Sequence, residues 1–321
     1  MKDLLIIIII FSLAIFGLPA ITGFMLSSGI IAASDKISKV QFPETINIYL
    51  EEKGEIKTVT GKEYIIGCLC AQIPINYELE ALKAQAAASA TYALRTIIEL
   101  KGKDKLPIGA DISDSKQLCQ SYYTEEQCKE QYGIDLEKFR YNLELAADYG
   151  ISHIITYDDE PIYAVYHSVS AGATCPAQYV WGTDIPYLKR TSSEADKNYI
   201  NFECVNQIKT EEARRMLMEY DPEIEIPVDP AKWFTDMQVN EEGYVISVNI
   251  GKNKFNGGDI WRIFGLRSVS FTVSYSSEIF TFITKGFGHG CGLSQYGANE
   301  LTKKGYTADQ IINYYYRLND V

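Results

Sequence analysis

Histidine, basic charge and long apolar runs are all scarce in this chain. Its 321 residues include three histidines, and 30 Lys and Arg side chains stand against 42 Asp and Glu, for a net charge of −12. So acidic a balance argues against a surface that binds nucleic acid or an anionic membrane. Beyond the N-terminal region, the sequence has no low-complexity segment, no internal repeat and no second run that could span a bilayer.

The single long apolar run lies at the N-terminus, where residues 4–34 carry no charge. This run is long enough to span a bilayer, whereas the apolar region of a signal peptide has only about 7–15 residues. We therefore expect residues 1–34 to be a membrane anchor with its flank and residues 35–44 a linker. The domain of residues 45–321 would lie outside the cell membrane, held by one pass; cleavage at residues 31–34 is the alternative.

The pattern along the rest of the chain predicts an α+β fold, a single mixed domain with a central Ala-rich helix after one N-terminal transmembrane helix. Strands and helices are expected from apolar alternation and from caps and turns. The expected elements are a hairpin at 46–60 turning at Lys53-Gly54, a strand at 62–73, the Ala-rich helix at 78–100, a helix at 136–150 capped by Gly150, a hairpin turning at 158–161, a helix at 206–220, strands around a short helix at 260–264, and a C-terminal helix capped by Thr307 and Gln310.

The odd number of cysteines gives no complete disulfide framework. Cys68 and Cys70 would share one face of the expected strand, where a buried thiol behaves as a small apolar group. A zinc site from Cys119, Cys128 and Cys175 with a histidine lacks the usual ligand spacing. The seven cysteines are Cys68, Cys70, Cys119, Cys128, Cys175, Cys204 and Cys291.

Two loops carry polar groups that could meet a ligand. In "GFGHGCGLSQYGAN", four glycines alternate with larger residues around His289, which lets the backbone approach a ligand closely. His289 could titrate near neutral pH or donate a hydrogen bond, or it could simply bond to the backbone of a packed turn. The loop "HSVSAGATC" presents Ser170 and Gly172. A thiol catalyst built from Cys175 or Cys291 with a histidine, His167 or His289, is a further alternative.

Five segments in order across about residues 45–317 resemble the stage II sporulation protein D family, which includes the amidase-enhancer proteins. They are "EYIIGCLCAQIPINYELEALKAQAAASATYAL", "YHSVSAGATCPAQYVWGTDIPYLK", "GLRSVSFTV", "GFGHGCGLSQYGAN" and "YTADQIINYYY". The resemblance implies a lytic transglycosylase that cuts peptidoglycan glycan strands around the forespore during engulfment, with a cell-wall amidase as partner. One carboxylic acid would protonate the glycosidic oxygen, and the muramic 6-hydroxyl would close a 1,6-anhydro ring. No cofactor is implied.

The family pattern also implies site residues in this chain. Lys83, Gln85, Tyr187, Lys189 and His289 match its cleft positions and, with Ser170, are the expected substrate-binding residues.

Two positions depart from the pattern. Gln72 stands where the family has its catalytic glutamate, and Ala90 where it has an arginine. The nearest remaining acids are Glu78 and Glu80, of which Glu80 is the candidate catalytic residue, with a helix-start role as its alternative.

A zinc-binding subset of the family has a cysteine and a His-Cys pair where this chain has Ser113, Leu118 and Cys119, so no metal is expected. Three functions stay open. The chain could be a transglycosylase that uses Glu80 or Glu78, a non-catalytic member that binds glycan or activates an amidase, or, as a minor alternative, a thiol or zinc hydrolase.

Overall fold

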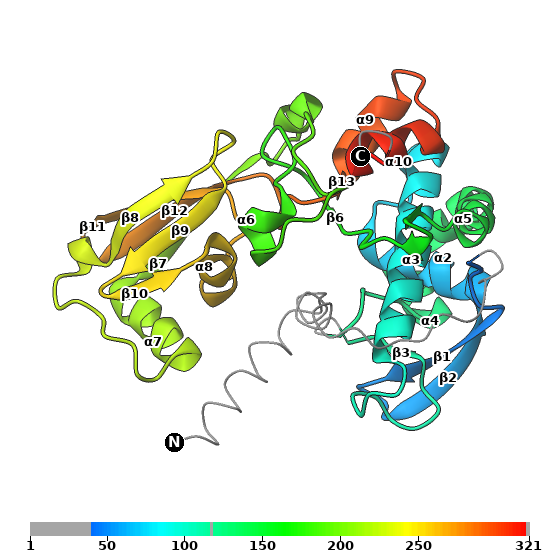
Figure 1. Ribbon diagram of the computed structural model, residues 1–321, viewed down its shortest axis with the longest axis horizontal. Helices are drawn as coiled ribbons and strands as arrows, with labels where there is room; N and C mark the ends of the chain where they lie inside the picture. The colour runs from blue at the N-terminus through cyan, green and yellow to red at the C-terminus, as the bar shows by residue number, and fades with distance from the viewer. Residues whose placement is uncertain (1–39, 116–117, 319–321) are drawn as a thin grey trace. The chain divides into compact units, whose positions relative to one another are not determined.

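The computed structural model describes residues 40–115 and 118–318, and its contacts divide them into two compact units. The first unit runs to Val165 and includes Thr302–Ile312; the second contains Tyr166–Leu301 and the residues from Asn313 on. Both units combine helices with small sheets, so the predicted mixed α+β fold is confirmed (Figure 1). The domain bounds of 45–321 stay a prediction.

The predicted membrane anchor, residues 1–34, lies outside the described residues. Across residues 40–115 and 118–318, no helix has both the length and the apolar character needed to cross a membrane.

The first unit begins with the predicted hairpin. Strand β1 (Thr45–Leu50) pairs antiparallel with β2 (Glu55–Thr60), and Gly54 in the turn has a positive φ of 63°. The short strand β3 (Ile112–Ser113) adds to β1 in parallel. One face of β1 is buried, with Ile46, Ile48 and Leu50 at alternate positions, as the period of a half-buried strand requires.

The strand predicted at 62–73 is wrong, because this segment is the helix α2 (Gly61–Gln72). Thr60 and Glu63 form a capping box that starts the helix. Tyr64, Ile65, Cys68 and Leu69 are buried at helical spacing. Cys68 and Cys70 are both buried, as expected, but on a helix and not on one face of a strand.

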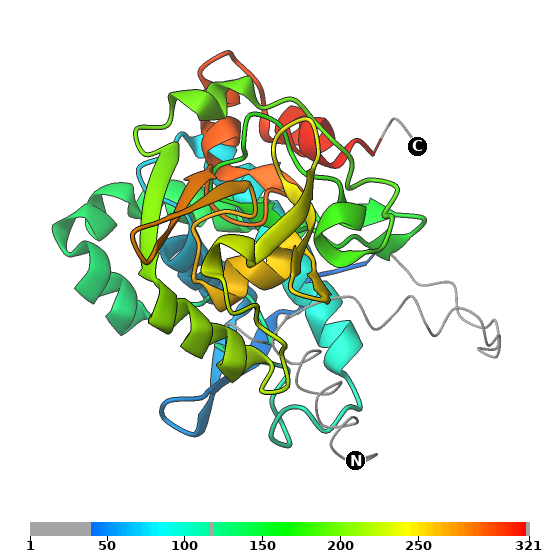
Figure 2. The same cartoon turned by 90° about the vertical axis from the view of Figure 1, so that its left-hand side faces the viewer.

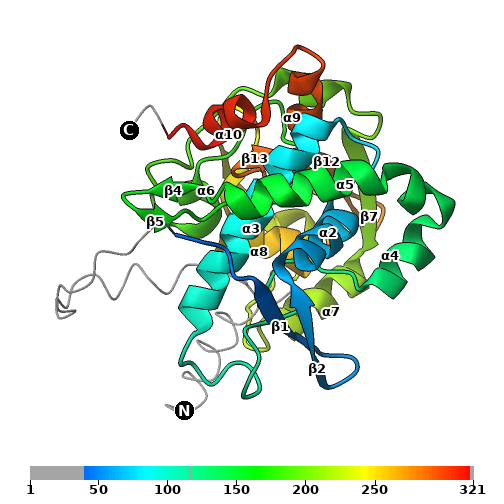
Figure 3. The same cartoon turned by 90° about the vertical axis from the view of Figure 1, so that its right-hand side faces the viewer.

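The central Ala-rich helix is confirmed as α3 (Leu79–Leu100), and its alanines allow close packing against α5 (Ile134–Ser152), as Figure 3 shows. The predicted cap at Gly150 is wrong, because α5 continues to Ser152. A Cβ on Gly150 would lie 2.7 Å from the backbone of Ala86, so Gly150 serves helix packing. Helix α4 (Glu125–Tyr132) precedes α5, and the β4 (Thr156–Tyr157)–β5 (Glu160–Pro161) hairpin follows it.

The second unit is built on two three-stranded antiparallel sheets (Figure 2). Their order is β11-β12-β7 and β10-β9-β8, and Phe280, Phe282 and Trp233 lie in the core beside them. The helix predicted at 206–220 begins at Thr210, because β7 occupies the residues before it. The elements are β7 (Glu203–Lys209), α7 (Thr210–Tyr220), β8 (Phe234–Val239), β9 (Val245–Ile250), β10 (Asn253–Phe255), α8 (Gly257–Ile263), β11 (Phe271–Ser276) and β12 (Ile279–Lys285).

The glycine loop follows β12 and leads to the short strand β13 (Leu293–Ser294), which pairs in parallel with β6 (Tyr166–His167). The same unit contains α6 (Ala177–Trp181) and the 3-10 helices η2 (Glu194–Asn198) and η3 (Pro230–Lys232). Helices α9 (Gln295–Thr302) and α10 (Ala308–Tyr316) complete the described chain. Thr307 and Gln310 bond reciprocally before α10, so the predicted capping box is confirmed.

Candidate functional site

Position 72, where the resemblance expects an acid, is held by a chain of amide hydrogen bonds. Gln72 ends α2 and donates from Nε2 to the carbonyl of Ser121 at 2.9 Å and to Oε1 of Gln120 at 3.3 Å. Gln120 in turn donates to the carbonyl of Ser89 at 2.8 Å and to Tyr64 at 3.2 Å. Main-chain carbonyls lie at both ends, so both amides must present their NH₂ groups to them. Gln72 therefore serves this site as a hydrogen-bond donor.

The other departure from the family pattern, Ala90, is fully buried in the hydrophobic cluster of the first unit. The matching residue Gln85 is also buried on α3, and its Nε2 lies 3.1 Å from Oγ of Ser89. Ala90 thus contributes to the packing of this cluster and lacks the positive charge of the arginine in the family pattern. Gln85 bonds to its own helix one turn away.

Glu80, the candidate acid, is bound on both carboxylate oxygens. One accepts a hydrogen bond from Nζ of Lys83 at 2.7 Å, and the other accepts from the backbone N–H of Ala308 at 2.8 Å, at the start of α10. Partial burial would raise the pKa of Glu80, but the bonds from Lys83 and Ala308 outweigh it and lower this pKa below its usual value. Lys83 Nζ also lies 5.8 Å from the ring centre of Tyr149.

A general acid must be protonated when the reaction begins, and Glu80 is ionised at neutral pH. Its contacts are those of a residue that caps one helix from another. The arrangement therefore disfavours Glu80 as the catalytic acid and supports its helix-start alternative. Glu80 and Lys83 are adjacent, as matching residues on one helix should be.

Ser170 is buried in the second unit and is fixed by a carboxylate that the sequence did not single out. Its backbone N–H donates to Oδ2 of Asp196 at 2.7 Å, and Ser294 donates to the same oxygen at 2.8 Å. Oγ of Ser170 accepts the N–H of Gly172 at 3.2 Å. Burial raises the pKa of Asp196 to about 6, although these hydrogen bonds oppose the shift. Asp196 thus joins the serine loop to the end of the glycine loop.

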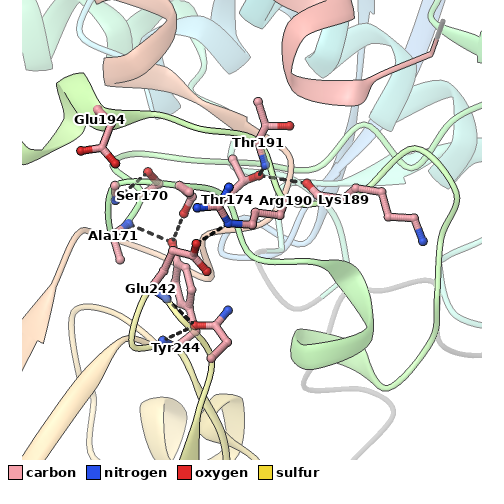
Figure 4. Close-up of polar contacts among 12 residues, drawn as sticks. Ser170, Ala171, Thr174, Lys189, Arg190, Thr191, Glu194, Glu242 and Tyr244 are labelled. Atoms are coloured by element: carbon pink, nitrogen blue, oxygen red, sulfur yellow. Dashed lines mark hydrogen bonds and ion pairs between the residues drawn. The ribbon is translucent and has the colours of Figure 1, made fainter. Parts of the chain in front are cut away.

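Tyr244 gives the serine loop a second anchor, as Figure 4 shows. The N–H of Ala171 donates to its hydroxyl at 2.9 Å, and the hydroxyl donates to the carbonyl of Ala173 at 3.1 Å. Two residues earlier, Glu242 forms an ion pair with Arg190. The β-turn before β9 therefore holds both the serine loop and the residue after Lys189.

Lys189 contacts the same loop through its backbone. Oγ1 of Thr174 donates to the carbonyl of Lys189 at 3.0 Å and accepts the N–H of Thr191 at 2.8 Å (Figure 4). Tyr187 is buried, whereas the Lys189 side chain is partly exposed and pairs with Asp184. The segments that carry Ser170 and Lys189 are thus connected by hydrogen bonds.

The ring of His289 is hydrogen-bonded to backbone groups. Nδ1 accepts the N–H of Cys291 at 3.1 Å, and the ring also bonds to the backbone of Tyr166. Burial lowers the pKa of His289 to about 4, so the imidazole is neutral at neutral pH. Of the two roles expected for His289, the lowered pKa and these contacts favour a packed turn over titration near neutral pH.

Trp181 is a site feature that sequence reasoning missed. It is the last residue of α6, is only partly buried, and its ring centre lies 5.3 Å from that of His289. His167 lies against another side of the same imidazole at 5.8 Å. The neutral imidazole of His289 therefore packs against the partly exposed indole of Trp181 beside the glycine loop. The only sequence signal was an aromatic residue just before "GTDIPYLK".

The thiol alternative has no activated pair to support it. Nδ1 of His167 lies 3.1 Å from the carbonyl of Cys291, so it bonds to backbone and not to sulfur. Burial raises the pKa of both Cys175 and Cys291 and lowers that of His167 to about 3. A metal set is likewise not seen: within the two described ranges, no three His, Cys, Asp or Glu side chains are grouped to hold an ion.

Comparison with known proteins places this geometry in a family. A model described as "Stage II sporulation protein" matches residues 49–157. Stage II sporulation protein D of Bacillus subtilis is 31% identical over 276 residues, which cover 86% of this chain and 78% of that protein. Its counterpart in Bacillus amyloliquefaciens is 29% identical over 280 residues, 87% of this chain and 79% of that protein.

A more distant relative is the amidase enhancer of Bacillus subtilis, which is 21% identical over 310 residues, 78% of this chain and 39% of that protein. Matches of this length exceed either unit alone, so both sporulation relatives align with residues of both units. On this similarity, the chain belongs to the stage II sporulation protein D family.

Proposed function

We propose that this protein binds the glycan strands of peptidoglycan during sporulation without cutting them by the acid-dependent route. The observation that carries the proposal is the amide at position 72, whose NH₂ group donates to Ser121 and Gln120. Lytic cleavage needs an acidic group that can transfer a proton to the glycosidic oxygen. A carboxamide donates hydrogen bonds but is not acidic enough to transfer a proton. Losing a general acid typically slows a reaction by about 10²–10⁴-fold.

Glu80 does not replace the missing acid. Its carboxylate is shared between Lys83 and the backbone of Ala308, and its lowered pKa leaves it ionised. Glu78, the other nearby acid, is the N-cap residue of α3 and is exposed to solvent.

The groups that we propose bind glycan belong to the second unit. Trp181 offers a partly exposed ring against which the apolar face of a sugar could stack, and Lys189 offers a cation on a connected segment. Aromatic surface with a few placed polar groups is typical of a ligand site. Tyr187, Ser170 and His289 then act by holding these segments in place, because they are buried or bonded to backbone.

The site of action would be outside the cell membrane, with residues 1–34 as a single anchor and the domain of 45–321 facing the wall. The uncharged run of residues 4–34 supports this arrangement. A cell-wall amidase is the proposed protein partner, since the amidase enhancer named among the relatives aligns with 78% of this chain.

The test uses purified protein and peptide-free glycan strands. Strand binding is measured by co-sedimentation, and 1,6-anhydro ends are sought by mass spectrometry. We expect binding without anhydro products from the parent chain, and anhydro products from Gln72→Glu. Products from the parent that disappear in Glu80→Gln would overturn the proposal and make this a transglycosylase with Glu80 as its acid. Absence of strand binding would overturn the glycan assignment itself.

A further inference from the structure

Helix α2 and the segment that enters α4 approach each other closely at Gly67. A Cβ at this position would lie 2.4 Å from both the ring of Tyr122 and the carbonyl of Tyr123. The N–H of Tyr123 donates to the carbonyl of Gly67 at 3.2 Å. Only glycine allows so close a contact, and the contact fixes which turns of the two helices face each other.

This register places two cysteines together, Cys70 one turn beyond Gly67 and Cys128 in the second turn of α4. The capping box of Thr124 and Gln127 defines where α4 starts, and Cys128 donates its backbone N–H to the carbonyl of Thr124. Both thiols are buried in the same hydrophobic cluster, and each influences the pKa of the other. The Tyr132 hydroxyl, at the end of α4, donates to the carbonyl of Cys70 at 2.8 Å and holds the same pair of helices.

The surroundings of the two thiols are unequal. The hydrogen bond from Cys70 lowers the pKa of Cys128, and the nearby Arg140 on α5 acts in the same direction. The same hydrogen bond, followed by burial, raises the pKa of Cys70. A second thiol beside an attacking thiolate can resolve the mixed disulfide that the attack forms.

We propose that Cys70 and Cys128 are a redox-active pair that forms an intramolecular disulfide by exchange with an external disulfide. The Cys128 thiolate attacks one sulfur of the oxidant, the oxidant's S–S bond breaks, and one thiol leaves. Cys70 then gives up its proton and attacks Sγ of Cys128, which breaks the mixed disulfide and releases the second thiol. The protein loses two hydrogens and two electrons, and the oxidant gains them as two thiols.

The disulfide would tie the C-terminal turn of α2 to α4, two residues before Gln72. Both thiols are almost fully enclosed, 2% exposed at Cys70 and 3% at Cys128, so the reaction requires local opening of α4 and is expected to be slow. Once formed, the bond closes a long loop of the unfolded chain and should raise the melting temperature by roughly 5–10 °C.

The experiment incubates the full-length folded protein with oxidised glutathione for several hours. Free thiols are then alkylated in denaturant, and disulfide-linked peptides are identified by mass spectrometry. We expect one intramolecular disulfide, which joins the peptides of Cys70 and Cys128, together with the rise in melting temperature and its reversal by dithiothreitol. A protein that keeps all seven thiols, or that pairs other cysteines, would overturn the proposal.

Matched variants separate this pair from its neighbours. Cys70→Ser and Cys128→Ser should each abolish the disulfide. Cys68→Ser, two residues away on the same helix, and Cys204→Ser, on β7, should leave it intact. Oxidation of the parent chain in denaturant provides a second measurement should a serine variant fail to fold. There the native geometry is lost, so mixed pairings are expected, and the same mixture from the folded chain would refute a preformed pair.

Discussion

Gln72 donates its side-chain amide to the main-chain carbonyl of Ser121, with 2.9 Å between Nε2 and the oxygen. An ionised carboxylate at this position would face that carbonyl and Oε1 of Gln120, two acceptors, with nothing to donate. The amide is therefore matched to its surroundings as well as unable to supply a proton.

The first prediction follows from this match. Gln72→Glu should introduce a carboxyl group whose pKa is raised, because its protonated form can donate to Ser121 and its ionised form cannot. Stability from that proton is present at low pH and is lost as the pH rises through the raised pKa. We expect the variant to be about 1–3 kcal/mol less stable than the parent at pH 8, and closer to it at pH 5.

Urea unfolding at the two pH values measures this difference. Gln72→Met is the control, since it keeps the length of the side chain, removes the donor and cannot titrate. Its deficit relative to the parent should be the same at both pH values. A Gln72→Glu variant as stable as the parent at pH 8 would show that the bond to Ser121 does not constrain this position.

The second prediction concerns Glu80, which accepts the N–H of Ala308 at 2.8 Å. Glu80→Ala removes both this cap and the partner of Lys83, and should destabilise the protein by about 1–2 kcal/mol. Glu80→Gln keeps an oxygen for Ala308 and should cost less. Because the pKa of Glu80 is lowered, its contribution is present at neutral pH and lost as the pH falls through that lowered pKa.

Thermal unfolding of the parent, Glu80→Ala and Glu80→Gln at pH 7 and pH 3 tests this account. The three proteins should be closer together at pH 3 than at pH 7. Equal stability of Glu80→Ala and the parent at pH 7 would contradict the capping role. Glu80 would then again be a candidate catalytic residue.

Asp196 supports a third prediction, on pH dependence in the second unit. Burial raises its pKa from 3.8 to about 6. The folded protein thus binds a proton at Asp196 more tightly than the unfolded chain, so this residue contributes stability below about pH 4 that is lost as the pH rises through 6. The shift corresponds to roughly 3 kcal/mol between pH 4 and pH 7.

Asp196→Asn removes the titration while keeping an oxygen for Ser170 and Ser294. Between pH 4 and pH 7, the free energy of unfolding of the parent should fall relative to this variant. Asp196→Ala, which removes the acceptor as well, should be destabilised at every pH. A difference between parent and Asp196→Asn that stays constant with pH would contradict the raised pKa.

Local signals in the sequence predicted local structure well. The Lys53-Gly54 hairpin, the helix α3 and the capping box of Thr307 and Gln310 each depend on residues close together in the chain, and each is present. The prediction for the α2 segment failed because its apolar residues are buried on several sides, so that a strand and a helix both fit the same run of residues. Its decisive signal was the Thr60–Glu63 capping box, which lies just before the run.

The candidate site was harder to predict, because contacts distant in sequence decide the roles of its residues. Asp196 meets Ser170 and Ser294 at separations of 26 and 98 residues, and no local pattern indicates either contact. The resemblance drew attention to His289 through its place in the glycine loop. Its pKa and its bonds to the backbone, however, depend on burial that only the folded chain has.

The last prediction tests Trp181 as the ring that meets a sugar. Of the three tryptophans, Trp181 and Trp261 are partly exposed and Trp233 is buried. Adding peptide-free glycan strands should change the tryptophan fluorescence of the parent and of Trp261→Phe, but not that of Trp181→Phe. Trp181→Ala should weaken strand binding by roughly 5- to 100-fold, as expected for the loss of a stacked aromatic side chain.

A pH series without glycan adds a readout that depends on His289. Its ring lies 5.3 Å from Trp181, and its lowered pKa, about 4, keeps it neutral in the usual range. Fluorescence from Trp181 should therefore be constant between pH 5.5 and pH 8 and change only as the imidazole gains charge near pH 4. A transition near pH 6.5 would contradict the lowered pKa of His289. Unchanged glycan binding in Trp181→Ala would place the sugar elsewhere on the second unit or on the first.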